Sequence, residues 1–227
     1  FNEQEDQYFG WPIWNPNNNT MWMSWMDRGQ NNLKIYELDM ATGAKKEVYK
    51  EYQKTWIDLE DRVSGRINFL SNNKGYIAQS DATGWNQLYL YDINGNLINP
   101  ITNGKYTVTS IKLIEEKTKT IYFTARGIEN TARADFYSIG FDGKNLKRLS
   151  KGNFNYSQVN LSPDAKHFVG LYSNANTPTA LSIFDIPKKG EPAVETIGTA
   201  VDSSFKADDY AKTELIRIKS ADGLYEL

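Results

Sequence analysis

The densest group of side chains that could bind a ligand lies in one short polar stretch. Three carboxylates, an arginine and a tryptophan fall within seven residues there: Trp56, Asp58, Glu60, Asp61 and Arg62. Charged residues on a loop that faces a channel can hold a charged ligand. The same composition also fits a solvated connector in which Trp56 anchors the chain in a neighbouring sheet. The residues alone leave both interpretations open.

Two other features could support acid–base chemistry. Glu115 and Glu116 are adjacent carboxylates, a pair suited to acid and base roles or to binding a cation. Because they fall in a polar turn, we interpret them as part of a solvated turn. His167 is the only histidine, so any Ser-His-Asp triad would have to use it. It follows the Ser-Pro-Asp turn at 162–164 and opens an apolar segment, which predicts a partly exposed histidine at a strand edge.

The sequence lacks the motifs that mark most nucleotide, metal and hydrolase sites. No Gly-x-Ser-x-Gly elbow, Walker loop or dinucleotide fingerprint occurs, and the absence of cysteine excludes disulfides, thiolate metal sites and cysteine nucleophiles. DINGN at 92–96 resembles a calcium loop but lacks the distant bidentate glutamate, so we predict a hairpin turn there. We expect no catalytic residue, no metal and no cofactor in this chain.

Composition and charge argue against two classes of partner. The chain carries 26 basic and 28 acidic residues, a net charge of -2, without a basic stripe. It therefore lacks the electrostatic footprint of nucleic-acid or anionic-membrane binding. No apolar run approaches the roughly 18 residues that span a bilayer. The first residue is Phe1 rather than Met, so we expect a piece of a longer protein, whose missing signal peptide says nothing about export.

The elements that must position these residues follow a repeat of 43 to 55 residues. Each unit opens with a first strand of only a hydrophobic residue or two, followed by a polar turn, at 14–20, 69–75, 113–120 and 161–167. An apolar segment follows each turn, at 21–26, 76–80, 121–125 and 168–173. An aromatic-rich segment closed by aspartate comes next, at 33–39, 87–92, 136–142 and 181–185, and then a weaker one, at 46–49, 97–102, 146–150 and 194–197. Their short length and their β-branched and aromatic content predict strands.

Four antiparallel strands per unit at this period indicate the blades of a propeller. We predict an all-β fold of four consecutive four-stranded antiparallel blades, at about 8–50, 62–102, 104–151 and 154–199. The structural alternative is a sandwich or barrel of about eight to sixteen strands, which would show no higher-order period. Residues 200–227 differ in character. After a polar stretch, Thr213–Lys219 alternates as one more strand, and a turn follows at Asp222–Gly223.

Several segments resemble, in the same order, the later propeller blades of the dipeptidyl peptidase IV family. They are WMDRGQNNLKIYELDMATG at 25–43, TWIDLED at 55–61, GWNQLYLYDINGNLINPITNGKYTVTSI at 84–111, IYFTAR at 121–126 and VNLSPDAKHFVGLYSNANTPTALSIFD at 159–185. The resemblance covers nearly all of residues 8–199. ELIRIKSADGLYEL at 214–227 is similar to the strand and turn by which that family's chain reaches its C-terminal α/β-hydrolase domain.

The resemblance implies a serine exopeptidase of the prolyl oligopeptidase type that removes N-terminal dipeptides, often after proline or alanine. Its eight-bladed propeller covers the hydrolase site and limits access to peptide ends. The family's amine-binding glutamate pair would then lie upstream of Phe1, and its catalytic Ser, Asp and His downstream of Leu227. The implied partners are a peptide substrate, the protein's own α/β-hydrolase domain and earlier blades, and a second copy in a full-length homodimer. An exported, periplasmic or cell-surface location is implied as well.

One set of site residues is implied by the resemblance. In the family, the loop after the tryptophan equivalent to Trp56 lines the pocket for the second substrate residue, which implies a place there for Glu60 and Asp61. Relatives carry an aromatic residue followed by arginine, so the acidic pair departs from the pattern.

A function of a different class also remains open. Exported scaffold proteins carry Ser-Pro-Asp turns like LSPDAKH at 161–167, and a stand-alone, non-catalytic propeller of this kind would bind proteins or glycans. Such a propeller would not hydrolyse Gly-Pro or Ala-Pro amides. Hydrolysis therefore separates the two functions.

Overall fold

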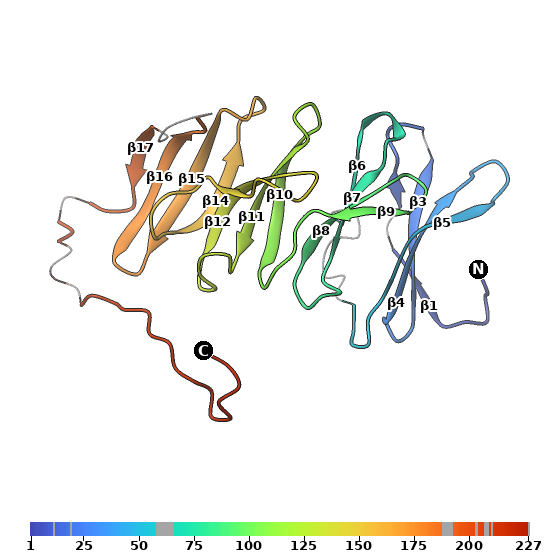
Figure 1. Cartoon of the computed structure of the whole chain (residues 1–227), viewed down its shortest axis with the longest axis horizontal. Helices are drawn as coiled ribbons and strands as arrows, with labels where there is room; N and C mark the ends of the chain where they lie inside the picture. The colour runs from blue at the N-terminus through green and yellow to red at the C-terminus, as the bar shows by residue number, and fades with distance from the viewer. Residues whose placement is uncertain are drawn as a thin grey trace. The chain divides into compact units, whose positions relative to one another are not determined.

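The computed structural model describes residues 1–10, 12–18, 20–57, 66–187, 193–202, 204–206, 209 and 211–226. Within these ranges, four sheets follow one another along the chain (Figure 1). The first sheet contains β1 (Gln7–Phe9), β2 (Ile13–Trp14), β3 (Met21–Asp27), β4 (Asn32–Leu38) and β5 (Lys45–Tyr52). The second contains β6 (Ile67–Phe69), β7 (Tyr76–Ser80), β8 (Gln87–Tyr91) and β9 (Leu97–Pro100), with a short 3-10 helix, η1 (Ser71–Asn73), after β6.

The third and fourth sheets repeat this order. The third contains β10 (Thr107–Glu115), β11 (Thr120–Arg126), β12 (Ala134–Gly140) and β13 (Lys147–Arg148). The fourth contains β14 (Asn155–Leu161), β15 (His167–Asn174), β16 (Thr177–Asp185) and β17 (Val194–Thr199). In each sheet the strands lie side by side in chain order. Four such antiparallel meanders in succession are propeller blades, which confirms the predicted fold class.

In the first sheet, the first strand of the four-stranded meander is interrupted. Both β1 and β2 pair with β3, at Phe9↔Trp25 and Ile13↔Trp22. Between them, the amide of Gly10 donates a hydrogen bond to the carbonyl oxygen of Ser24 at 3.0 Å. The two short strands therefore take the place of one inner strand.

The second and third strands of each sheet lie where the sequence predicts them, but two first strands are longer than the pattern indicates. β10 has nine residues and β14 has seven. Register shifts interrupt both strands. They lie between Val108 and Ser110 and between Ile111 and Leu113 in β10, and between Tyr156 and Gln158 in β14. A bulge places two residues opposite one and so breaks the period-two alternation that reveals a strand in a sequence.

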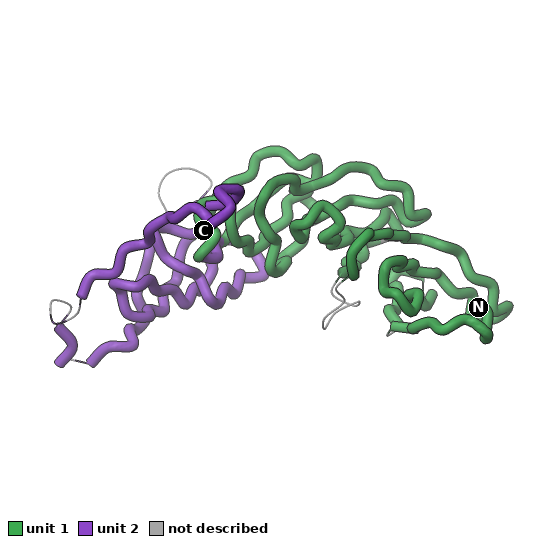
Figure 2. The backbone as a smooth tube through the Cα atoms, turned by 90° about the horizontal axis from the view of Figure 1, so that it is seen from below, with its two compact units in different colours: residues 1–132, 136–149 green, residues 133–135, 150–227 purple. Residues whose placement is uncertain are grey.

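The chain divides into two compact units, residues 1–132 with 136–149 and residues 133–135 with 150–227 (Figure 2). In the first unit, one cluster of buried side chains lies between the first and second sheets. Trp22 is fully buried there, and its ring meets those of Phe69 and Tyr76 edge to face, at 4.6 Å and 5.2 Å. Such aromatic pairs stabilise a core beyond the area they bury.

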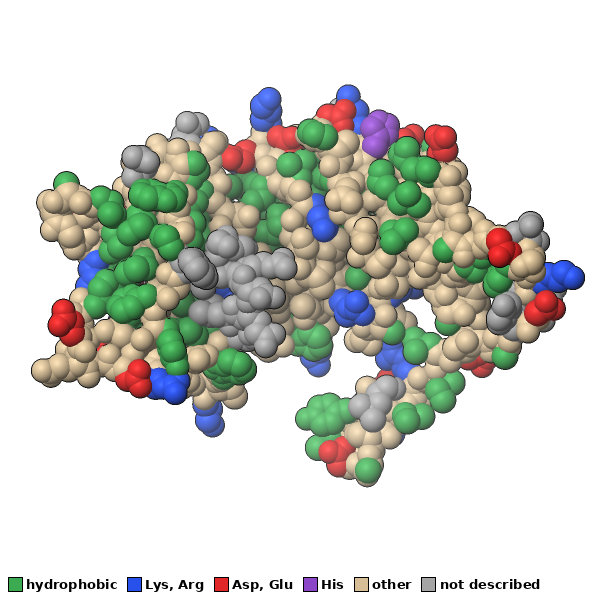
Figure 3. Space-filling model, turned by 180° about the vertical axis from the view of Figure 1, so that it is seen from behind, with side chains coloured by type: hydrophobic (Ala, Val, Ile, Leu, Met, Phe, Trp, Pro, Cys, Tyr) green, Lys and Arg blue, Asp and Glu red, His purple; other side chains and the backbone are tan. Residues whose placement is uncertain are grey.

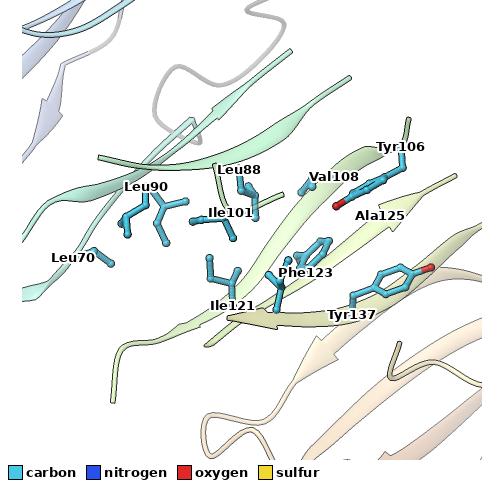
Figure 4. Close-up of a cluster of buried hydrophobic side chains, with 12 residues drawn as sticks. Leu70, Leu88, Leu90, Ile101, Tyr106, Val108, Ile121, Phe123, Ala125 and Tyr137 are labelled. Carbon is cyan, nitrogen blue, oxygen red and sulfur yellow. The ribbon is translucent and has the colours of Figure 1, made fainter. Parts of the chain in front are cut away.

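A second cluster in the same unit joins the second and third sheets (Figure 4). Leu88 and Ile101 lie on one side, and Ile121 and Phe123 on the other. Each of these side chains is at most 2% exposed. Burying a side chain of this size stabilises a fold by about 1.5–3 kcal/mol. Apolar contacts between neighbouring sheets are therefore a major stabilising contribution within this unit.

The turn between β8 and β9 is the hairpin that the sequence predicts for 92–96. The Asp92 carboxylate accepts the amides of Asn94 and Asn96, at 2.8 Å and 2.9 Å. Gly95 has a φ of 89°, and a Cβ atom there would lie 2.4 Å from the carbonyl oxygen of Val48 in the first sheet. Glycine is thus required twice, for the left-handed backbone and for the close approach.

In the second unit the core is a stack of aromatic rings. Phe168 and Phe184 lie parallel with ring centroids 4.6 Å apart, and Tyr156 packs against both. Gly170 gives these rings room, because a Cβ atom there would lie 3.1 Å and 3.2 Å from the rings of Tyr156 and Phe184. This glycine is selected by packing, since its backbone is not in the left-handed region.

The last segment differs from its prediction. Thr213–Lys219 forms no strand ladder, and Lys219 makes only an isolated bridge with Glu226 across a turn at 220–223. Leu215 and Ile216 are 67% and 70% exposed. A strand needs a paired neighbour and a surface that covers its apolar face, and the described part of the chain offers this segment neither. None of the described helical residues forms a helix long and apolar enough to cross a membrane.

Candidate functional site

The polar stretch singled out in the sequence is held on both sides by residues of the first unit. Before it, Ile57 is fully buried in the core between the first two sheets. After it, Arg66 lies within ion-pair distance of Glu51 and Asp81, at 3.9 Å and 3.6 Å. Residues 58–65 lie outside the described residues, and with them four of the predicted site residues: Asp58, Glu60, Asp61 and Arg62. Trp56, the fifth, is described.

Arg66 belongs to a largely buried polar group between the first two sheets. Glu51 is 9% exposed, and its carboxylate accepts hydrogen bonds from the Tyr49 hydroxyl and the Gln53 side chain, each at 2.5 Å. The Gln53 amide also donates to Asp81 at 2.8 Å. Burial first, and the Glu51 carboxylate second, raise the pKa of Tyr49 well above its ordinary value. Tyr49 therefore remains a hydrogen-bond donor to Glu51 at neutral pH.

The turn between β3 and β4 supports the chain before the polar stretch. The Asp27 carboxylate accepts the main-chain amides of Asn31 and Asn32, at 2.9 Å and 3.0 Å, and the Asn32 side chain at 2.6 Å. Partial burial opposes ionisation of Asp27, but the hydrogen bonds from Asn32 and Asn31 outweigh it and lower the pKa of the carboxyl. Gln30 has a φ of 56°, which is uncommon for a residue other than glycine. The Asp27 carboxylate thus stabilises an otherwise unfavourable turn.

Asn31 connects this turn to the chain that leaves β5. Its side-chain nitrogen donates to the carbonyl oxygens of Gln53, Lys54 and Thr55, at 3.1 Å, 3.4 Å and 2.8 Å. Its own carbonyl oxygen accepts the amide of Gln53 at 3.0 Å. One asparagine therefore holds three consecutive residues.

Gln30 holds the next two residues. Its carbonyl oxygen accepts the amide of Ile57 at 2.8 Å, and its side-chain oxygen accepts the indole N–H of Trp56. Trp56 is nevertheless 57% exposed, so its indole nitrogen is bonded while much of its ring faces solvent. The buried residue of this segment is Ile57 rather than the tryptophan. Gln30 also borders a shallow hollow together with Tyr8, Phe9, Gly10, Ser24 and Met26.

The two adjacent glutamates have separate partners. Glu116 accepts the main-chain amide of Ser71 at 2.8 Å and its hydroxyl at 2.6 Å. Glu115 accepts the amide of Lys117 in its own turn, at 3.1 Å. The two carboxylates therefore do not work as an acid–base pair here. Glu115 stabilises its turn, whereas Glu116 links the third sheet to the second.

His167 is exposed at the start of β15, as the sequence predicts (purple in Figure 3). Its Nδ1 atom lies 2.8 Å from the carboxylate of Asp185, the residue opposite it on β16. The hydroxyl of Ser162 accepts the main-chain amide of His167 at 3.0 Å, so this serine contacts the backbone and not the ring. The contacts are those of a strand end, without the order of a catalytic triad.

The residues around Trp56 offer positioning rather than bond-making. Among the described residues, no group of three or more acidic or histidine side chains could hold a metal ion. What the segment presents is an aromatic ring on a backbone held by Gln30 and Asn31. The sequence did not lead us to Gln30 or Asn31, although it contains a signal for Asn31. Asparagine also stands directly before the third strand of the second and fourth sheets, at Asn86 and Asn176.

The chain is similar to known proteins of one family. The profile described as "Dipeptidyl peptidase IV (DPP IV) N-terminal region" matches residues 1–179. A dipeptidyl peptidase 4 of Arthroderma otae is 29% identical over 189 residues, which cover 81% of this chain and 24% of that protein. One of Trichophyton rubrum is 29% identical over 157 residues, 67% of this chain and 20% of that protein. This chain thus spans less than a quarter of the length of these relatives.

A solved structure agrees on the fold. The crystal structure of Porphyromonas gingivalis dipeptidyl peptidase 4 superposes with a TM-score of 0.76 at 23% sequence identity, covering 96% of this chain and 30% of that one. The profile match extends over well more than half of the chain and includes the first three sheets and, in the fourth, β14 and β15. On these grounds, the chain belongs to the family of dipeptidyl peptidase IV N-terminal regions.

Proposed function

We propose that this chain is the substrate-gating propeller part of a dipeptidyl peptidase IV-like serine exopeptidase that releases dipeptides from peptide N-termini. The observation that carries the proposal is the family match over residues 1–179, joined to an exposed Trp56 held beside the polar stretch. A ring whose indole nitrogen and backbone are already bonded can contact a peptide at a small further entropy cost.

In this proposal the propeller binds the peptide and limits access to the active site, whereas another domain makes and breaks the covalent bonds. The nucleophile, base and acid belong to an α/β-hydrolase domain of the parent protein. Trp56 covers part of the peptide, and Asp58, Glu60, Asp61 and Arg62 hold its polar groups. Fixing a peptide relative to a nucleophile can lower a barrier by about 7–11 kcal/mol in the best cases. Gating of this kind turns a general acyl-transfer site into one that acts at a fixed distance from the free amine.

The first sheet supports the expectation of a further blade before it. Along β3, buried Trp22 and Ser24 alternate with Met23 and Trp25, whose side chains point away from the second sheet. Exposed Phe9 and Trp14 pair with the same strand, and hydrophobic side chains gather over this part of the molecule in Figure 3. An earlier blade would cover this apolar face. Export to the periplasm or cell surface and a full-length homodimer are parts of the same proposal.

Hydrolysis by the parent protein tests the proposal. The full reading frame should encode a Gly-x-Ser-x-Gly motif within roughly 150 residues of the propeller, the size of one domain. The purified product should release dipeptides from Gly-Pro and Ala-Pro amides, and should leave the same substrates intact when their amino group is acetylated. Binding of a protein or glycan without any hydrolysis would instead identify the non-catalytic propeller.

A further inference from the structure

The contact between Asn31 and Gln53 recurs in the second sheet. The carbonyl oxygen of Asn86 accepts the amide of Val108 at 2.9 Å, and the Asn86 side chain donates to the carbonyl oxygen of Val108 at 2.7 Å. Both asparagines stand one residue before the third strand of their sheet, β4 or β8. Both partners lie 22 residues farther along the chain, at 53 − 31 and 108 − 86. The two sheets thus use the same reciprocal pair of hydrogen bonds.

The chain beyond the contact differs between the two sheets. Val108 already belongs to β10, the first strand of the next sheet. After Gln53, by contrast, the next described strand begins only at Ile67. The Asn86 contact therefore leads the chain straight into a strand. The Asn31 contact leads it into a segment that contains the exposed Trp56.

Asn31 also makes hydrogen bonds that Asn86 does not make. Its side-chain nitrogen reaches the carbonyl oxygens of Lys54 and Thr55 in addition to that of Gln53. The second bond donated by the Asn86 side chain goes to Gln79 on a neighbouring strand. The additional contacts of Asn31 thus hold the residues directly before Trp56. Propagating a strand needs no such contacts.

We propose that Asn31 is a positioning residue that fixes residues 53–55 so that the Trp56 ring stands ready to contact a peptide. The inference rests on the proposed function and names the residue through which Trp56 is held. If residues 53–55 were free, binding would have to immobilise them, and the lost entropy would weaken affinity. Asn31 supplies this order before the peptide arrives.

Substituting Asn31 tests the inference in the full parent protein. Asn31→Asp keeps the shape of the side chain but replaces the donor by an acceptor facing three carbonyl oxygens. Affinity for the dipeptide Ala-Pro, an end product that is not consumed, is measured by calorimetry. We expect it to fall about 3- to 10-fold, the range of one or two hydrogen bonds. The amides of residues 54–57 should exchange with solvent faster. If Asn31→Asp folds poorly, Asn31→Ala, which lacks this repulsion, takes its place in the test. It should also lower the affinity for Ala-Pro.

Asn86→Asp is the matched control, because it breaks the same reciprocal pair away from Trp56. It should lower the melting temperature as Asn31→Asp does and leave the affinity for Ala-Pro unchanged. Equal losses of affinity in the two variants would reveal a general effect on folding and overturn the inference. So would an Asn31→Asp protein that binds Ala-Pro as the unmodified protein does.

A double-mutant cycle shows whether Asn31 acts through Trp56. In a Trp56→Ala background, Asn31→Asp should cause no further loss of affinity, because the ring it positions is gone. A full additional loss there would contradict the inference. Hydrolysis of Ala-Pro amides is scored separately. A protein that binds Ala-Pro but does not hydrolyse the amides refutes the proposed function alone, and one that does not bind Ala-Pro refutes both.

Discussion

The side chain of Asn176 pairs with the main chain of Thr213 as a neighbouring strand would. Its Oδ1 atom accepts the amide of Thr213 at 2.8 Å, and its Nδ2 atom donates to the carbonyl oxygen at 2.9 Å. Asn176 directly precedes β16, so this is the third asparagine before a third strand that bonds the chain farther along. Here it holds the start of a segment that forms no ladder of its own.

Removing this contact should release the last segment without unfolding the second unit. Asn176→Ala is expected to cost less than about 1 kcal/mol in free energy of unfolding, because the bonds are exposed. Trypsin should cut after Lys212 faster, since protease access follows local opening. Cleavage after Lys151, whose main chain is bonded to the Tyr156 hydroxyl within the second unit, should stay unchanged and serves as the internal control. Equal acceleration at both sites would indicate global destabilisation instead.

Glu116 and Glu115 should differ in their effect on stability. Glu116→Ala removes both hydrogen bonds to Ser71 that link the third sheet to the second, at an expected cost of about 1 kcal/mol. Glu115→Ala removes one bond within a turn and should cost less. Urea unfolding of the two variants measures the difference. Identical midpoints would contradict the role of Glu116 as a link between sheets.

Gly84 and Gly95 both have a left-handed backbone, but only Gly95 is also in close contact with a neighbouring strand. Their φ angles are 89° and 87°, but a Cβ atom at Gly84 would have no atom within 4 Å, whereas one at Gly95 would collide with Val48. Gly84→Ala should cost about 1–2 kcal/mol for the left-handed backbone alone. Gly95→Ala should add about 1–3 kcal/mol for the collision. Thermal melting of both variants checks the ordering, and a smaller loss for Gly95→Ala would refute it.

Trp22→Phe should lower the free energy of unfolding much less than Trp22→Ala. Trp22→Ala empties a fully buried site and should cost about 3–5 kcal/mol. The indole N–H of Trp22 has no hydrogen-bond partner in the described structure, so Trp22→Phe removes a buried polar group that was not compensated. We expect Trp22→Phe to cost less than half as much in denaturant unfolding. Comparable losses would show that the indole nitrogen is satisfied in solution.

Alkaline pH should unfold the first unit through its buried tyrosines. Burial, followed by the neighbouring Tyr89, raises the pKa of Tyr91 to about 12. An unfolded tyrosine titrates near pH 10, so folding favours the protonated form. This contribution to stability is complete below about pH 10 and is lost as the pH rises toward 12. Melting temperatures between pH 9 and 12, read with tyrosinate absorbance, should fall steeply, and less steeply in Tyr91→Phe. An equal slope in the variant would exclude Tyr91 as a cause.

The fold could be predicted where a strand shows its alternation in the sequence. Along β3, Trp22, Ser24 and Met26 are buried and their neighbours are not, so the pattern is readable from the residues. Each bulge in β10 and β14 shifts that alternation by one residue, so the lengths of these strands could not be predicted from the sequence. Thr213–Lys219 shows the reverse case, since it alternates without a partner strand.

The candidate site could be found from the composition of its sequence, but the residues that support it could not. Trp56 stands in a visibly unusual run of charges, which local reading detects. Asn31 lies in a turn, where asparagine is expected for its own backbone preference, and nothing local reveals a bond to residues more than 20 positions away. Glu51 and Arg66 likewise meet only once the sheets are packed.

The recurring asparagine also bears on how such a chain can evolve. In three of the sheets, the residue before the third strand bonds chain that lies beyond the fourth strand, so each of these blades carries its own attachment for the next segment. A gene duplication that copied one blade would copy the attachment with it, and the protein could lengthen by whole blades without a new junction. Insertions placed after Ile57 would leave the contacts of Asn31 and Gln30 intact, so this connector can lengthen at little risk to the fold.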